Sequence, residues 1–201
     1  MKESSFKQLL VVALSTLMFF GCHMATTDKQ GMLNENTYFS SKKPNIQIVV
    51  DDQYQYSEEA ESYDHKFINV EKHRVFYILN SPPYHNQRRM EYYYSPDSWM
   101  FNNYPTSIRL HQGELKIIGK TWYYRDCVLK PTTANCVMIR DLGMFTPADG
   151  LLKVLYILEL PPYTCSQWNK SNSFTDEQEE AYKYFLEGFA SDIKITNYQG
   201  E

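Results

Sequence analysis

The segment "VFYILNSPPY" at residues 75–84 returns as "VLYILELPPY" at residues 154–163. Seven of the ten positions are identical, and the second copy begins seventy-nine residues after the first. Each copy is an unbroken apolar run that is followed by two prolines. Such a run without alternation is typical of a strand buried on both faces, and proline ends a strand because it has no N–H to donate. The repeat therefore predicts two central strands that each leave a sheet through a stiff corner.

The repeat also indicates an internal duplication. A fainter echo supports it, because "IQIVVDDQYQY" from Ile46 resembles "LKIIGKTWYYR" from Leu115. We predict a single β-rich α+β domain built from two related halves, 45–106 and 107–201, that share a sheet. The alternative is coincidence, since buried strands draw on few residue types.

Further elements follow from local patterns in the sequence. Alternating or β-branched runs predict strands at 45–50, 121–130, 136–145 and 192–196. "SIRLHQGELKII" predicts a hairpin with its turn at Gln112-Gly113. The chain should end in an amphipathic helix that begins after Thr175, because Gln178 completes a capping box and carboxylates fill the first turn.

The composition is that of a globular domain. The chain has 201 residues, 43% of them hydrophobic and 22% charged, with a net charge of −4. This length suffices for one domain with a real core. No basic excess exists, so nucleic acid is not an expected partner.

The N-terminus has the order of a secretory signal peptide. Lys2 and Lys7 form a basic head, and an apolar run extends from Leu9 to Phe20. Twelve helical residues span about 18 Å, which is too short for a hydrocarbon core of about 30 Å. We expect residues 1–21 to be removed after export; a permanent anchor or a buried N-terminal helix is the alternative.

The run stops at Gly21-Cys22, and here the segment resembles the lipobox of bacterial lipoproteins. The resemblance covers residues 1–22 and implies cleavage before Cys22 and acylation of its thiol. His23, rather than Asp, follows the cysteine, which by the same resemblance implies the outer membrane and a domain that faces the periplasm. The rest of the chain, 23–201, resembles no family that we recognise.

Residues 22–44 should then form the lipidated cysteine and a tether, with the domain at 45–201. This segment is mostly small or polar and has no sustained period. Removal of Lys2, Lys7 and Glu3 takes the net charge from −4 to −5. An acidic body gains nothing from an anionic membrane, so the acyl chains must hold it there.

Three cysteines remain in the expected mature domain, and the periplasm favours disulfides. Three pairings of Cys127, Cys136 and Cys165 are possible from the sequence. We expect a Cys127–Cys136 bridge across a short loop, with Cys165 left over as a small buried residue.

No catalytic, cofactor or metal motif is evident. The five histidines lie in no H-E-x-x-H or similar context, no C-x-x-C is present, and there is no glycine-rich phosphate loop. We therefore predict no catalytic residue, no cofactor and no metal site. The candidates for binding are aromatic residues near the Pro-Pro-Tyr corners and in the aromatic block between them: Tyr84, Trp99, Tyr104 and Tyr163. The alternative is that these residues fill the core, as aromatic residues of strands more often do.

These observations favour a non-catalytic lipoprotein whose periplasmic domain binds an envelope protein or polymer. One alternative is a cell-envelope hydrolase in which Cys165 or a carboxylate pair meets a histidine. Another is a periplasmic immunity or inhibitor lipoprotein, since the acidic charge would suit a basic partner.

Overall fold

A computed structural model describes residues 30–41, 45–57, 65–81, 107–130, 136–146, 150–165, 167–168 and 174–200. A seven-stranded antiparallel sheet has the spatial order β4 (Gln55–Ser57), β5 (His65–Asn69), β6 (Arg74–Ser81), β10 (Gly150–Leu160), β9 (Cys136–Thr146), β8 (Lys120–Leu129) and β7 (Ser107–Ile117). A four-stranded antiparallel sheet has the order β1 (Gln30–Asn34), β2 (Thr37–Ser40), β3 (Ile46–Val50) and β11 (Ile193–Asn197). The described helices are α4 (Pro162–Cys165) and α5 (Asp176–Asp192).

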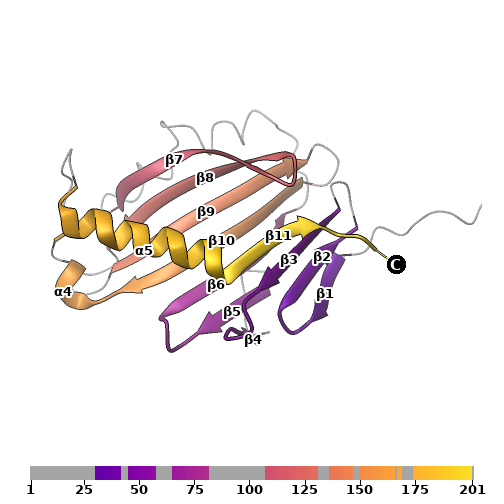
Figure 1. Ribbon diagram of the computed structural model, residues 1–201, viewed down its shortest axis with the longest axis horizontal. Helices are drawn as coiled ribbons and strands as arrows, with labels where there is room; N and C mark the ends of the chain where they lie inside the picture. Colours follow the sequence, from indigo (N-terminus) through magenta and orange to yellow (C-terminus); the bar gives the residue numbers. More distant parts are fainter. Residues whose placement is uncertain are drawn as a thin grey trace, which may run out of the picture.

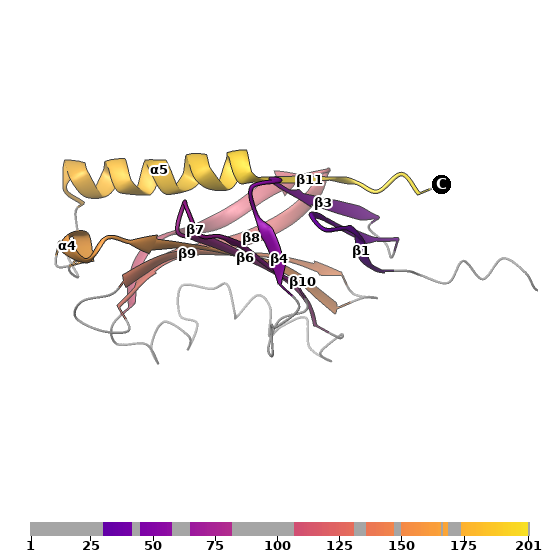
Figure 2. The same ribbon diagram turned by 90° about the horizontal axis from the view of Figure 1, so that it is seen from below.

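These elements form two layers. Helix α5 and the four-stranded sheet lie end to end and cover the same face of the seven-stranded sheet (Figures 1 and 2). The core lies between the layers and is rich in stacked aromatic rings. Phe76 and Tyr156 from adjacent strands have ring centroids 4.7 Å apart, and Tyr156 stacks on Phe185 of α5 at 5.0 Å. The predicted β-rich α+β class is confirmed.

The two repeat segments are neighbours in the middle of the larger sheet. β6 and β10 pair antiparallel, with Val75 opposite Ile157 and Ile78 opposite Val154. Each also pairs on its other side, with β5 and β9 respectively. The prediction of two central strands is therefore correct.

Their register does not support equivalence of the repeats. Tyr77 of β6 lies opposite Leu155, whereas the matching Tyr156 lies opposite Phe76. Because directly opposed residues share a face and neighbours along a strand alternate, the two matching tyrosines face opposite sides of the sheet. Tyr156 is fully buried beneath α5, and Tyr77 is half-buried on the other face.

The two proposed halves share the larger sheet, as predicted, and they also share the smaller one. β3, from the first half, pairs with β11, from the second half, in the smaller sheet. The weaker echo is not equivalent either, since Ile46 begins β3 in the smaller sheet and Leu115 lies near the end of β7 in the larger one. The structure therefore favours the alternative of coincidence, since buried strands draw on few residue types.

The expected hairpin at Gln112-Gly113 is wrong. β7 runs without interruption through Gly113, which lies opposite Tyr124 of β8. A Cβ on Gly113 would lie 3.2 Å from the Tyr124 ring, so glycine here allows close packing and does not form a turn. The turn follows at Ile118 and Gly119, whose φ angles of 51° and 72° suit a two-residue hairpin loop.

The predicted tether, residues 22–44, is longer than the structure allows. Residues 30–40 form the β1–β2 hairpin of the smaller sheet, in which Tyr38 is fully buried opposite Ile48. The two strands are only five and four residues long, so the alternation of apolar and polar residues is too brief to be recognised in a polar segment.

Helix α5 follows its local sequence. Thr175 is the N-cap, and its side chain and that of Gln178 complete the predicted capping box. Phe185 and Phe189 of the apolar stripe are buried against the sheet. No helix in the described part of the chain is long and apolar enough to cross a bilayer, and the apolar run from Leu9 to Phe20 lies outside that part.

Candidate functional site

The predicted binding residues are only partly placed. Tyr84, Trp99 and Tyr104 lie outside the described residues, and so do Cys22 and the signal segment. The backbone of Tyr163 lies in α4, directly after β10.

The strands that lead to the two Pro-Pro-Tyr corners end far apart. Ser81 at the end of β6 pairs with Leu151 near the start of β10, whereas β10 ends at Leu160. Leu160 lies nine positions after Leu151 along the strand, a distance of about 30 Å. The two strand exits therefore lie at opposite ends of the β6–β10 pair.

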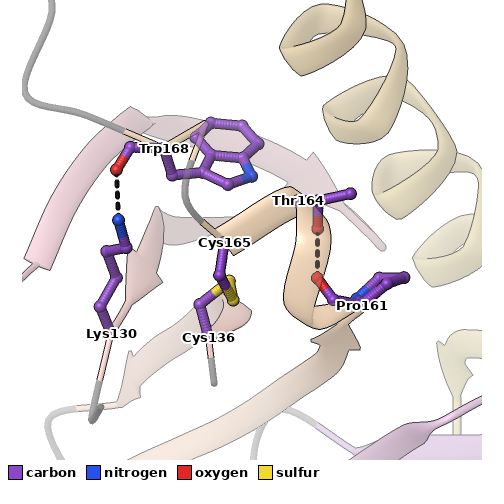
Figure 3. Close-up of a disulfide and its surroundings, with 6 residues drawn as sticks. All are labelled: Lys130, Cys136, Pro161, Thr164, Cys165 and Trp168. Atoms are coloured by element: carbon purple, nitrogen blue, oxygen red, sulfur yellow. Dashed lines mark hydrogen bonds between the residues drawn. A yellow bond between two sulfur atoms is a disulfide. The ribbon is translucent and has the colours of Figure 1, made fainter. Parts of the chain in front are cut away.

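At the end of β10 the connection to α5 is fastened to the sheet by a disulfide (Figure 3). Cys165, at the end of α4, is bonded to Cys136, the first residue of β9, with an S–S distance of 1.98 Å. Both cysteines are buried. The bridge closes a segment with a sequence separation of 29 residues and so joins the β9–β10 hairpin to the α4 corner.

A disulfide was expected, but its predicted pairing was wrong. Cys127 lies opposite Ile139, and Cys136 is three residues before Ile139 on β9. An odd separation along a strand puts two side chains on opposite faces, so Cys127 and Cys136 point away from each other. Cys165 is buried as expected, yet it is the partner of Cys136, and Cys127 is a free thiol.

Polar contacts and a buried tryptophan also hold the residues that follow α4 against the sheet and against α5. Lys130 Nζ donates to the backbone oxygen of Trp168 at 2.6 Å, and Gln178 Nε2 donates to that of Gln167 at 2.8 Å. Trp168 is 2% exposed and meets the Phe174 ring edge-on. The segment is thus held by the sheet, by α5 and by its own packing.

The three described cysteines offer no ready nucleophile for the hydrolase alternative. Cys165 is consumed in the disulfide. Burial raises the pKa of the Cys127 thiol to about 12, although Arg125 opposes the shift. A thiol with this pKa is protonated at neutral pH and is a poor nucleophile.

The described histidines lie in three separate places. His65 Nδ1 lies 3.2 Å from the Tyr56 hydroxyl, and His111 Nδ1 lies 2.9 Å from that of Tyr124. His73 Nδ1 lies 3.5 Å from Glu159, but both of these side chains are about two-thirds exposed. His23 and His85 lie outside the described residues.

A buried ion pair lies on the inner face between β8 and β9. Arg140 donates two hydrogen bonds to Asp126, at 2.8 and 2.7 Å, and Tyr182 of α5 donates a third at 2.5 Å. The Arg140 guanidinium also lies 5.1 Å from the Phe189 ring centroid. Such a fully hydrogen-bonded pair fixes the position of the helix over the sheet.

A second buried pair fixes the other end of α5. Asp192, the last residue of the helix, accepts from Arg74 at 2.6 Å and from Tyr54 at 2.8 Å, and Ser191 donates to its other oxygen. Burial opposes ionisation of Asp192, but hydrogen bonds from Tyr54, Ser191 and Arg74 outweigh it and hold the pKa of the carboxyl below its usual value. Burial and the Asp192 carboxylate together raise the pKa of Tyr54.

The sequence analysis missed these charged residues, although one signal was present. The dipeptide Arg-Asp occurs in both "YYRDCV" and "MIRDLG", each time inside an apolar strand. In the structure the two dipeptides are opposed, so Asp126 meets Arg140 on the inner face and Arg125 meets Asp141 on the outer face. Lys153 adds a second contact to Asp141 at 3.1 Å. These are structural networks, and none is open to a ligand at its carboxylate.

The described residues contain no group of three or more His, Cys, Asp or Glu side chains that could hold a metal ion. The arrangement they do form is a rigid, disulfide-fastened sandwich. A partner would therefore contact the surface of the described residues rather than an enclosed reactive centre.

Comparison with known proteins identifies the fold. No family model matches the sequence. No curated protein matches it either. Among solved structures, the Ran-binding protein Mog1p of Saccharomyces cerevisiae aligns with a TM-score of 0.50 over 84% of this chain and 95% of its own. The fold is similar to that of Mog1p.

Sequence identity to Mog1p is 14%, so the likeness concerns the fold alone. The cyanobacterial PsbP protein of Synechocystis covers 85% of this chain at 8% identity, with a TM-score of 0.42. That score is too low for any argument to be drawn from it. The two sheets with one long C-terminal helix are thus an architecture of the Mog1p type.

Proposed function

We propose that this protein is a lipoprotein of the outer membrane, anchored through Cys22, whose periplasmic domain is a non-catalytic binding module for an envelope protein or polymer. The observation that carries the proposal is the buried Cys136–Cys165 disulfide, which leaves Cys127 as the free cysteine of the described residues. Disulfides persist in oxidising compartments such as the periplasm. This agrees with export by the signal-like segment.

The fold supports a binding role in a general sense. Mog1p is named as a Ran-binding protein, so a domain of this architecture can serve recognition of another protein. At 14% identity the partner does not transfer, and none is inferred from it.

Metabolic labelling tests the anchor. Cells grown with labelled palmitate should yield labelled wild-type protein in the outer membrane. The Cys22→Ser variant should be unlabelled and should leave the membrane fraction. Wild-type protein that is unlabelled and cytosolic would rule out the placement.

Partner binding is tested through the aromatic residues that the sequence singles out. Alanine replacements of Tyr84, Trp99, Tyr104 and Tyr163 should reduce crosslinking to envelope components while the melting temperature stays unchanged. Alanine replacement of Tyr123, a half-buried residue of β8 that is not one of the four candidates, provides a matched control. Variants that lose cooperative melting would show that the aromatic residues belong to the core.

A second candidate is an immunity or inhibitor lipoprotein, favoured by the charge of α5. Five of its six carboxylates are exposed, together with one lysine, and the sixth is the buried Asp192. A basic toxin would be attracted to this surface. Replacement of Glu179 and Glu180 by lysine should then abolish partner capture at low salt, whereas binding to a neutral polymer should not change.

A further inference from the structure

The four-stranded sheet has one face in the core and one face turned away from it. Tyr38, Ile48 and Ile195 lie in one register row on the core face. The neighbouring row on the outer face contains Phe39, Gln47 and Thr196. Figure 2 shows this sheet in the upper layer, so its outer face points away from the larger sheet.

This outer face carries several apolar side chains that are partly exposed to solvent. The Phe39 and Tyr198 rings are in contact, with centroids 5.0 Å apart, and both side chains remain partly exposed. Val49 is also half-buried on this face, and Leu33 of the adjacent edge strand is 49% exposed. Tyrosine and phenylalanine in such positions suit a membrane–water interface, where one end is apolar and the other is wet.

The charge distribution points the same way. The strands of this sheet contain no Asp or Glu, and their one charged residue is Lys194, which is exposed on the outer face. The first turn of α5, at the other end of the same layer, carries Asp176, Glu177 and Glu179. The described turns of the sheet add the exposed carboxylates of Glu35 and Asp52, so an anionic surface would repel the helix end more strongly than the sheet end.

The chain emerges from this same sheet. β1, its edge strand, begins at Gln30, eight residues after Cys22. Even fully extended, eight residues span no more than about 29 Å. A lipid on Cys22 therefore keeps the smaller sheet close to the bilayer surface, whereas the start of α5 lies the length of a 17-residue helix farther along.

We propose that the outer face of the four-stranded sheet rests on the lipid headgroups of the membrane, with Phe39 and Tyr198 at the interface. This inference rests on the proposed acylation of Cys22. The contact orients the domain and does not hold it, since the net charge of the mature chain is acidic. It presents the acidic end of α5 and the disulfide-fastened corner away from the bilayer.

Site-directed spin labelling of the acylated protein tests the orientation. Nitroxides would be placed at Gln47→Cys on the sheet face and at Glu180→Cys on α5, both in a Cys127→Ala background. The protein is bound to vesicles of phosphatidylethanolamine with a minority of phosphatidylglycerol. The label at position 47 should be several-fold less accessible to a water-soluble nickel chelate than in the non-acylated protein, and the label at position 180 should not change.

Two other results separate the possible failures. If the acylated protein floats with the vesicles but both labels stay equally accessible to the chelate, the surface contact is wrong while the anchor stands. If the protein is not acylated and does not float, the proposed anchor fails and the inference falls with it. The pair Phe39→Ser and Tyr198→Ser should restore chelate access at position 47 without changing flotation.

Discussion

At Gly188, α5 lies close to buried polar groups of the sheet. A Cβ at this position would lie 2.6 Å from Arg74 Nη2 and 2.7 Å from the Tyr156 hydroxyl oxygen. Both groups are buried, and Arg74 is held by its bond to Asp192. The glycine therefore makes room for the second buried ion pair.

We expect Gly188→Ala to destabilise the protein even though alanine favours helices by about 1 kcal/mol. The added methyl must displace buried polar groups, and overpacking of this kind costs about 1–3 kcal/mol. Urea unfolding would measure the change, with Glu187→Ala on the exposed side as the control. A Gly188→Ala variant as stable as the wild type would show that Arg74 can move freely.

Asp192 links stability to pH. Its pKa is lowered in the folded state, so its contribution is fully present above the unfolded pKa of about 3.9 and is lost as pH falls through the folded pKa. Asp192→Asn leaves Arg74 buried without its counter-charge, which should cost about 3 kcal/mol at pH 7. The stability of the variant should then fall less steeply below about pH 4 than that of the wild type. Asp52→Asn, at an exposed position, should leave the stability at pH 7 unchanged.

At the scale of elements, the disulfide decides how the β10–α5 connection is held. The chain-entropy model assigns about 3–4 kcal/mol to a loop of this length. Cys165→Ala and Cys136→Ala should each lose that stability, whereas Cys127→Ala should lose little, because Cys127 is a free thiol. Chemical denaturation of the three variants distinguishes this pairing from a Cys127–Cys136 bridge, for which the roles of Cys127 and Cys165 would be exchanged.

The start of the helix could be predicted from the local sequence, whereas the role of a residue within a strand could not. Thr175 and Gln178 define the start of α5 through contacts within four residues, so the capping box could be predicted. Gly113 could not be interpreted from its neighbours in sequence. Its role is set by Tyr124 on the next strand, and only the pairing of β7 with β8 brings the two together.

At the scale of the molecule, the boundary of the domain can be tested by truncation. A chain that begins at residue 30 retains both strands of the β1–β2 hairpin, whereas one that begins at residue 45 removes it along with the fully buried Tyr38. Burial of one such side chain is worth about 1.5–3 kcal/mol, and loss of the hairpin also uncovers one side of β3. We expect the first truncation to melt like a chain that begins at residue 23 and the second to melt at a much lower temperature. Equal melting of the two truncations would show that the hairpin is dispensable.

The sequence by itself determined the α+β class, the two central strands at the repeats and the capped C-terminal helix, because each depends on residues close together in the chain. Only the tertiary structure decided the face that each repeat presents, the partner of Cys136 and the opposed Arg-Asp dipeptides. The physical reason is the alternation of side chains along a strand. Two residues that are one or three positions apart along a strand place their side chains on opposite faces of the sheet. Which residues then come into contact depends on the neighbouring strand and on its register.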